Sequence, residues 1–306
     1  MTKKLVVVGK EFGVGAIHAL AHSTEFWAAL KAAKILGVPY ALTCHDDVAY
    51  VLSYNPLRAL ALKRLGTAWR EAHVRFVISS ALGQEYCRRY GSRQFQVVTH
   101  GLATVQAQAR RAVPGRLCVY FSGSIHNSYA ANFRSLVQAL ELLRRSRPDL
   151  EVSLLGRGSP PPGELPPWVG FKEFKSEQHQ SEDLNEADVM YLPLPFGRRQ
   201  APFCRFSLPT KLIAYLGAGL PILCHAPDYS GASKILNNRG AGIIVSDLNP
   251  LVLAQGLLLA LRNRESLATS SLRLAREEFL LANTKLIFWT ALQEIQASPS
   301  QNTVIC

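Results

Sequence analysis

The sequence lacks the features that mark membrane-spanning, disulfide-bonded and zinc-binding proteins. No apolar run reaches the ~20 residues that a membrane-spanning helix needs. The six cysteines are scattered without a Cys-x-x-Cys pair, which indicates reduced core residues of a cytoplasmic protein rather than a disulfide framework or a zinc site. Because residues 1–9 lead straight into an apolar stretch, we also expect no signal peptide.

Acidic residues are few compared with basic ones, and the imbalance is concentrated in one part of the chain. The protein carries 34 Lys and Arg against 22 Asp and Glu, a net charge of +12. Residues 1–112 contribute +9 (15 basic, 6 acidic), and the remainder contributes +3 (19 basic, 16 acidic). The first part is therefore expected to face a lipid headgroup, a phosphorylated carrier or nucleic acid, although a solvated basic surface would have the same composition. Nucleic acid is disfavoured, because no helix-turn-helix, RNA-binding or zinc pattern is present.

Short apolar stretches alternate with helical patterns along the whole chain, which predicts parallel α/β sheets. With 306 residues, of which 48% are hydrophobic, the chain is long enough for two domains. Residues 106–115 have the composition of a linker, so we place the domains at 1–110 and 111–306. We expect strands at 5–9, 40–44, 74–78 and 96–99 in the first, and at 117–121, 150–155, 189–192, 221–224 and 242–245 in the second.

Residues 205–224, RFSLPTKLIAYLGAGLPILC, predict a turn, a short helix, a glycine break and a buried strand. Ser207 is placed to cap the helix, and Pro209 suits its first turn. Free amides at a helix start, together with the Thr210 hydroxyl and the Lys211 ammonium, favour an anion such as phosphate. An ordinary capped helix with a surface lysine would show the same pattern.

Titratable residues follow the predicted strand at 40–44. His45, Asp46 and Asp47 come directly after it, where open α/β sheets bind ligands. With Asp46 beside it, His45 is therefore a candidate functional residue at the end of this strand. A structural histidine with satisfied hydrogen bonds is the alternative.

The order of these landmarks resembles the GT-B glycosyltransferases, specifically the retaining family 4 (group 1) type, over about residues 37–296. Each motif is weak alone, and six in register are fairly specific. They are Gly37-Val38-Pro39 with Thr43-Cys44-His45-Asp46, Ser79 with His100-Gly101, Phe121-Ser122-Gly123, Leu154-Leu155-Gly156-Arg157-Gly158, Ala187-Asp188-Val189, and Pro209-Thr210-Lys211-Leu212 with Gly219-Leu220-Pro221.

The resemblance implies two Rossmann-like parallel-sheet domains with a cleft between them, the N-terminal one shortened. The second would bind a nucleotide-diphosphate sugar without a metal or other cofactor, the first would present the acceptor, and the last helix would return to the first domain. The implied donor-binding residues are Gly123, Ser124, Gly156, Arg157, Arg205, Ser207, Leu208, Pro209, Thr210 and Lys211; the implied catalytic residues are His45 and Asp46.

The chain departs from the family pattern at several positions. The two family glutamates fall on Phe206 and Ala214, and Ser124 replaces an arginine. A lysine expected soon after is absent from His126-Asn127-Ser128, so Arg157, Arg198 or Arg205 would have to substitute. About the first third of the family's N-terminal domain, including its glycine-rich loop, has no counterpart.

Two functions remain open from the sequence. The leading one is a retaining sugar transfer to a lipid-linked or polysaccharide acceptor. We expect the protein in the cytoplasm, either free or bound to the anionic inner face of the membrane. The alternative is a non-catalytic GT-B relative that serves as a binding or partner subunit.

Overall fold

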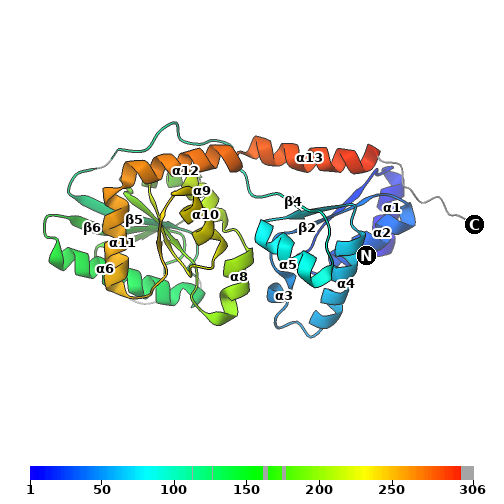
Figure 1. The fold of residues 1–306 in the computed structure, drawn as a ribbon, viewed down its shortest axis with the longest axis horizontal. Helices are drawn as coiled ribbons and strands as arrows, with labels where there is room; N and C mark the ends of the chain where they lie inside the picture. The colour runs from blue at the N-terminus through cyan, green and yellow to red at the C-terminus, as the bar shows by residue number, and fades with distance from the viewer. Residues whose placement is uncertain (112, 126, 161–164, 174–176, 298–306) are drawn as a thin grey trace, which may run out of the picture. The chain divides into compact units, whose positions relative to one another are not determined.

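The computed structural model describes residues 1–111, 113–125, 127–160, 165–173 and 177–297 (Figure 1). His126, Cys306 and part of the 106–115 linker lie outside these residues. Contacts divide the chain into two units. The first unit holds residues 1–99, 205–207 and 282–306, and the second holds 100–204 and 208–281. The boundary proposed at residue 110 stays a prediction.

The first unit is built on a four-stranded parallel sheet in the order β1-β2-β3-β4. Its strands are β1 (Ile17–Leu20), β2 (Tyr40–Cys44), β3 (Val74–Val77) and β4 (Gln96–Val97). Its helices are α1 (Thr2–Glu11), α2 (Glu25–Leu36), α3 (Val48–Val51), α4 (Arg58–Glu71), α5 (Ser80–Tyr90) and nearly all of α13 (Leu281–Ala297).

Side chains of α13 cover one face of this sheet. Phe288, Ala291 and Ile295 of α13 pack on a small core that includes Val74 and Phe76 of β3. Because side chains alternate between the faces of a strand, these two β3 residues point to the same side. The C-terminal helix is therefore part of the core of the first unit, as the family resemblance implied.

The expected strand at 5–9 is wrong, since these residues lie in α1 and the first strand is β1. Residues 5–8 form an apolar run too short to distinguish a helix from a buried strand. In the fold α1 packs on α2, where a Cβ atom on Gly9 would lie 2.5 Å from Leu36 Cδ1. The run therefore covers a neighbouring helix and pairs with no strand.

The second unit holds a six-stranded parallel sheet in the order β10-β9-β8-β5-β6-β7. Its strands are β5 (Arg116–Ser122), β6 (Glu151–Arg157), β7 (Val169–Lys172), β8 (Val189–Pro193), β9 (Ile222–His225) and β10 (Ile243–Val245). Its helices are α6 (Ala130–Ser146), α7 (Glu177–Glu186), most of α8 (Ala201–Phe206), α9 (Thr210–Leu216), α10 (Gly231–Arg239), α11 (Pro250–Arg262) and α12 (Arg264–Glu278).

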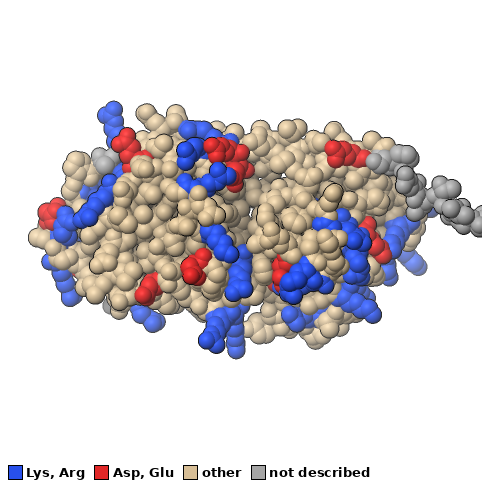
Figure 2. Space-filling view, in the orientation of Figure 1, with Lys and Arg blue, Asp and Glu red and all other residues tan. Residues whose placement is uncertain are grey.

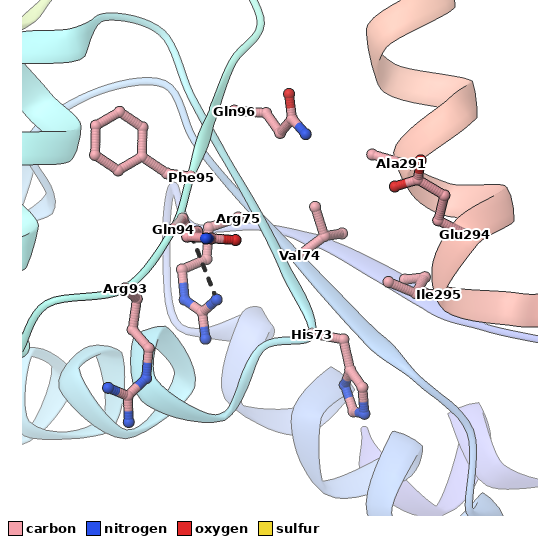
Figure 3. Close-up of a pocket in the computed structure, with 10 residues that line it drawn as sticks. All are labelled: His73, Val74, Arg75, Arg93, Gln94, Phe95, Gln96, Ala291, Glu294 and Ile295. Carbon is pink, nitrogen blue, oxygen red and sulfur yellow. Dashed lines mark hydrogen bonds between the residues drawn. The ribbon is translucent and has the colours of Figure 1, made fainter. Parts of the chain in front are cut away.

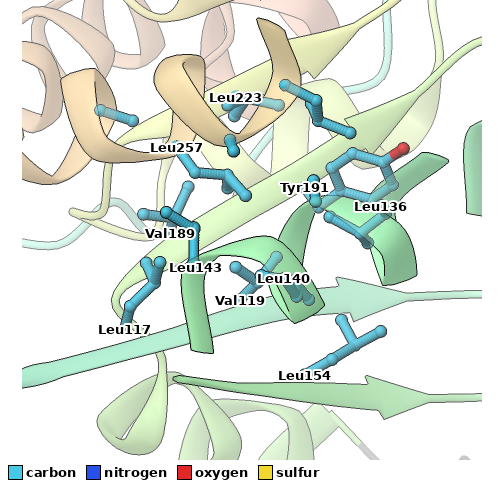
Figure 4. Close-up of a cluster of buried hydrophobic side chains, with 14 of the residues drawn as sticks. Leu117, Val119, Leu136, Leu140, Leu143, Leu154, Val189, Tyr191, Leu223 and Leu257 are labelled. Carbon is cyan, nitrogen blue, oxygen red and sulfur yellow. The ribbon is translucent and has the colours of Figure 1, made fainter. Parts of the chain in front are cut away.

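A continuous apolar core joins the second sheet to α6 and α11, as Figure 4 shows. Leu136 and Leu140 of α6 and Leu257 of α11 are fully buried against Val119 and Tyr191 of the strands. Helix α9 contacts β8 and α12. The sheet is thus supported by helices, which leaves the loops at its strand ends to form a site.

Buried ion pairs also fix the start of β8. Asp188 is fully buried and pairs with Arg116 at 2.8 Å and with Arg264 at 2.6 Å. Arg264, the first residue of α12, also donates to the carbonyl of Arg111. A buried carboxylate needs such partners, so this cluster ties α12 to the amino ends of β5 and β8.

In the residues that the structure describes, the cysteines are free thiols, in agreement with the sequence, and Cys44, Cys118, Cys204 and Cys224 are buried. None of the described helices has both the length and the apolar character required to cross a bilayer.

Candidate functional site

Lys211 lies at the carboxyl end of β5 because of a hydrogen bond one helical turn away. The backbone N–H of Ser122, the last residue of β5, donates to the Tyr215 hydroxyl at 2.9 Å. Lys211 and Tyr215 are four residues apart on α9 and therefore share a face. The bond that fixes Tyr215 thus brings Lys211 to the loop after β5.

The loop after β5 is a glycine turn in close contact with Lys211. Gly123 has φ +122°, a conformation that only glycine adopts readily. A Cβ atom there would lie 2.4 Å from Lys211 Cε and 2.9 Å from its Nζ. Gly158 approaches from the loop after β6, since its own Cβ would lie 2.4 Å from the Gly123 carbonyl oxygen. Gly123 therefore leaves room for the Lys211 side chain, and Gly158 leaves room for Gly123.

The Lys211 ammonium is half-buried against aromatic rings. Its Nζ lies 4.6 Å from the centre of the Phe121 ring and 5.4 Å from that of Tyr129. Burial lowers the pKa of Lys211 to about 8, because removing the charged form from water is unfavourable. No carboxylate pairs with this ammonium in the part of the chain that the structure describes. An anionic ligand would supply that missing charge.

A cavity of about 490 Å³ opens beside this turn. Gly123 and Ser124 line it from the loop after β5, Arg157 and Gly158 from the end of β6, and Glu173 from the end of β7. It therefore lies at the carboxyl ends of neighbouring parallel strands, where α/β proteins bind ligands. Three of the residues expected to bind the donor, Gly123, Ser124 and Arg157, meet here.

Arg157 is already paired inside the protein. Its guanidinium makes a two-point ion pair with the buried carboxylate of Asp183, and Lys172 Nζ lies 3.1 Å from the same carboxylate. The hydrogen bond to Asp183 raises the pKa of Arg157. Gly156 is also structural in character, because a Cβ atom there would lie 2.2 Å from the Phe171 ring. No pattern in the sequence pointed to Asp183, which lies 26 residues from Arg157.

The expected helix start at Ser207 is wrong. Helix α9 begins at Thr210, and Pro209 precedes it in an extended conformation with ψ 130° and no side-chain cap. Leu208 is buried, Thr210 is exposed, and Arg205 is exposed at the end of α8. Because α9 has only seven residues, the positive group at this position is the Lys211 ammonium and not the helix start.

Ser207 instead contacts a residue expected to be catalytic. Its Oγ donates to Asp46 Oδ1 at 2.6 Å, and both residues belong to the first unit. Ser79, which caps α5, donates to the Phe206 carbonyl at 2.6 Å. Segment 205–207 is therefore held at the carboxyl end of the first sheet. Sequence reasoning missed these contacts because the partners are more than a hundred residues apart.

His45 is exposed directly after β2, as expected, and a second histidine lies nearby. His18 on β1 is hydrogen-bonded through Nε2 to Thr43 Oγ1 at 2.6 Å. Burial, followed by the proximity of His45, lowers the pKa of His18. Sequence reasoning missed His18, because the first strand was expected at 5–9 and no strand was expected at 17–20.

Phe206 and Ala214 stand at the two positions where the resembled family has glutamates. Phe206 lies under the Arg89 guanidinium, 5.8 Å from ring centre to Cζ, and Ala214 is exposed on α9. Arg198 is exposed in the loop after β8. No cluster of three His, Cys, Asp or Glu side chains suited to a metal ion occurs among the described residues.

A larger cavity, of about 730 Å³, lies elsewhere in the first unit (Figure 3). It is found at the amino ends of β3 and β4, between Arg75 and Arg93 on one side and Glu294 of α13 on the other. Arg75 donates to the carbonyls of Arg70 and Gln94, so its buried guanidinium closes the end of α4. Burial and Arg93 lower its pKa to about 10. This cavity lies at the amino ends of the strands, whereas His45 lies at their carboxyl ends, so we do not assign the donor to it.

No family model matches the sequence, and no curated protein matches it either. Solved structures do. The chain is similar to HepE of Anabaena in complex with UDP, with a TM-score of 0.69, 16% identity, and coverage of 96% of this chain and 82% of that one. A UDP-forming α,α-trehalose-phosphate synthase from Burkholderia xenovorans matches with a TM-score of 0.68, 14% identity, and 97% and 78% coverage. TarM matches with a TM-score of 0.65, 11% identity, and 96% and 58% coverage.

These matches, together with the two parallel sheets, confirm the expected α/β class and the two Rossmann-like sheets. The sheet of the first unit has four strands and that of the second has six.

Proposed function

We propose that this chain, which has the GT-B fold, is a glycosyltransferase that moves a sugar from a nucleotide-diphosphate sugar to a lipid-linked or polysaccharide acceptor. The observation that carries the proposal is Lys211. It is a half-buried ammonium without a carboxylate partner among the described residues, placed at a glycine turn beside a cavity. A diphosphate is an anion whose charge and size suit this position.

We assign the donor diphosphate to Lys211 and to the loop of Gly123 and Ser124. UDP is the first nucleotide to test, because the Anabaena HepE structure is a complex with UDP and the Burkholderia synthase is UDP-forming. Because Arg157 is paired with Asp183, Lys211 is the residue of this set whose positive charge is available to the diphosphate. The proposed reaction needs no metal, since the ammonium takes the part that Mg²⁺ has in other transferases.

We assign the acceptor to His45 and Asp46 of the first unit. The Ser207 hydroxyl holds Asp46 in one orientation, which suits a carboxylate that must accept a proton from an acceptor hydroxyl or orient His45. Retention of configuration at the sugar carbon is part of the proposal and follows from the family resemblance.

Calorimetric titration with UDP tests donor binding. A charge-assisted hydrogen bond is worth ~1.5–3 kcal/mol, so Lys211→Ala should weaken UDP binding by about ten- to a hundredfold. Lys234→Ala removes an exposed lysine from α10 and should leave the dissociation constant unchanged. An equal dissociation constant for Lys211→Ala and the unaltered protein would place the nucleotide elsewhere.

Turnover tests the roles of the first unit. A positioned acid–base group contributes ~10²–10⁴-fold to a rate, so His45→Ala and Asp46→Asn should each reduce kcat by this order. UDP affinity should change little, because the proposed donor residues belong to the second unit. Loss of UDP binding together with turnover would contradict this division of roles.

The exposed Ala214 favours a second candidate, a non-catalytic binding subunit, because an alanine cannot hold donor hydroxyls where the family has a glutamate. Ala214→Glu distinguishes the two. A gain in donor affinity and transfer would support the enzyme. If neither the unaltered protein nor this variant binds any sugar nucleotide at millimolar concentration, the binding-subunit function replaces it.

A further inference from the structure

The surface of the first unit carries an apolar projection between α3 and α4. Its side chains, which we call the 51–60 tip, are Val51, Tyr54, Leu57 and Leu60, and they are 37%, 87%, 61% and 42% exposed. A Tyr side chain that is 87% exposed contributes almost nothing to a core. Four large apolar side chains within ten residues are also more than the single exposed residues that ordinary surfaces carry.

The tip is an ordered turn. The backbone N–H of Asn55 donates to the Leu52 carbonyl and that of Arg58 to the Asn55 carbonyl, both at 3.0 Å. The Asn55 side chain accepts from the Leu57 N–H at 2.8 Å, and Leu52 is buried beneath. These bonds hold Tyr54 and Leu57 outward, so their exposure belongs to the folded state.

Basic side chains border the tip and acidic ones are absent from it. Residues 48–70 contain Arg58, Lys63, Arg64 and Arg70 and neither Asp nor Glu. Figure 2 shows Lys and Arg gathered over α4 and α5 on the face in view. Arg64 and Lys31 lie on the Trp27 ring, with 5.6 Å and 5.5 Å to its centre, so the cationic border extends onto α2.

We propose that the 51–60 tip and its basic border dock this protein on an anionic lipid bilayer. A bilayer surface offers anionic headgroups and, a few ångströms deeper, hydrocarbon. The cations Arg58, Lys63 and Arg64 suit the headgroups, and the exposed side chains of Tyr54 and Leu57 suit the hydrocarbon boundary. Tyrosine and tryptophan suit this boundary, because each ring has an apolar body and a polar atom. A soluble polyanion would match the cations but would leave the apolar side chains in water. The docking does not depend on the proposed sugar transfer.

Co-sedimentation of the full chain with lipid vesicles tests the docking, without any nucleotide or acceptor. Phosphatidylcholine vesicles containing phosphatidylglycerol should bind the protein, and pure phosphatidylcholine should bind it much less. Each surface cation is worth about fivefold in partition, so Arg58→Gln/Lys63→Gln/Arg64→Gln should lose about a hundredfold. High salt should reduce binding of the unaltered protein similarly, because the screening length falls to ~3 Å at 1 M.

A second variant tests the apolar part. Tyr54→Ser/Leu57→Ser retains every charge and should weaken binding by about tenfold or more, because the buried apolar area is lost. A tryptophan placed by Tyr54→Trp should be quenched by brominated lipid beyond the quenching of the native tryptophans. These outcomes require insertion of the tip and not adsorption by charge alone.

Matched variants of the second unit serve as controls. Arg145→Gln/Lys234→Gln/Arg262→Gln removes three exposed charges, and Leu251→Ser/Leu259→Ser removes two exposed leucines. Both should bind vesicles as the unaltered protein does. Circular dichroism confirms that all variants are folded.

Three results would overturn the proposal. One is equal recovery of the unaltered protein with neutral and anionic vesicles at low salt. Another is unchanged binding of the Tyr54→Ser/Leu57→Ser variant. The third is a larger loss from Val7→Ser/Val8→Ser, which alters exposed valines of α1, than from the tip variants. Sugar transfer to a soluble acceptor should be the same in all of these variants, so failure of the docking is distinguishable from failure of the proposed activity.

Discussion

At the scale of single residues, the protonation of Lys211 links structure to the proposed function. The ammonium has aromatic rings on one side and glycines on the other, with no carboxylate partner in the described part of the chain. Its pKa of about 8, against an ordinary 10.5, means that the folded protein holds this proton less tightly than the unfolded chain does. An anionic ligand reverses that preference, because it stabilises the charged form.

The affinity for UDP should therefore depend on pH. Below pH 8 the ammonium is charged and binding is strong, and above pH 8 the affinity should fall by about tenfold per pH unit as the proton is lost. Lys211→Arg should bind UDP with nearly constant affinity through this range, because a guanidinium stays protonated. Calorimetric titrations at a series of pH values check this. A flat profile for the unaltered protein would show that the ammonium does not meet the nucleotide.

The same shift affects stability with the opposite sign. Between about pH 8 and 10.5 the unfolded chain binds more protons at this position, so this group's contribution to stability rises with pH. Below pH 8 it costs stability, and because the side chain is half exposed we discount this cost to ~1 kcal/mol. Lys211→Met should accordingly raise the melting temperature by about 2 °C at pH 7 while it removes UDP binding. A lower melting temperature would contradict the assignment of Lys211 as an unpaired cation.

At the scale of elements, the glycine turn after β5 leaves the space that the Lys211 side chain occupies. Gly123 donates its N–H to the Arg157 carbonyl at 2.7 Å, which joins the turn to the end of β6. Arg157 is in turn fixed by Asp183 of α7. The turn is thus supported on one side by a buried ion pair and faces Lys211 on the other.

Replacement of Gly123 by alanine should displace Lys211 without unfolding the sheet. The new Cβ would lie 2.4 Å from Lys211 Cε, in a backbone conformation that costs alanine about 1 kcal/mol or more. UDP affinity should fall by about tenfold, with only a small loss of stability. Gly170→Ala provides the control, because no atom lies within 4 Å of its added Cβ. Equal UDP binding by the two variants would remove the turn from the site.

At the scale of the whole molecule, each unit has its own sheet and core, and the chain passes between the units more than once. The first unit takes in residues 205–207 and the C-terminal helix as well as residues 1–99. Its core under α13 is small, with Ala291 at its centre, 3% exposed. The first unit therefore cannot complete its core until α13 has been synthesised.

A buried charge in α13 should selectively unfold the first unit. Ala291→Asp places a carboxylate among apolar side chains, which should cost ~3 kcal/mol or more and lower the first of two transitions in calorimetry. Leu286→Asp, on the same helix but 68% exposed, should change neither transition. If Ala291→Asp and Leu286→Asp have the same transition temperatures, α13 is not a core element of the first unit.

The sequence alone determined the α/β class and most strand positions, because apolar runs and the helical patterns between them are encoded within a few residues. It also indicated which loops follow strand ends, and hence His45 and Gly123 as candidates, and it singled out Lys211 as a cation near an expected helix start. Only the tertiary structure decided that residues 5–8 are helical, because a short apolar run fits either element until its neighbour is known. It also decided that Ser207 bonds Asp46, 161 residues away, and that Arg157 is paired with Asp183. Long-range pairing depends on how the sheets bring distant loops together, and no local pattern in the chain encodes that.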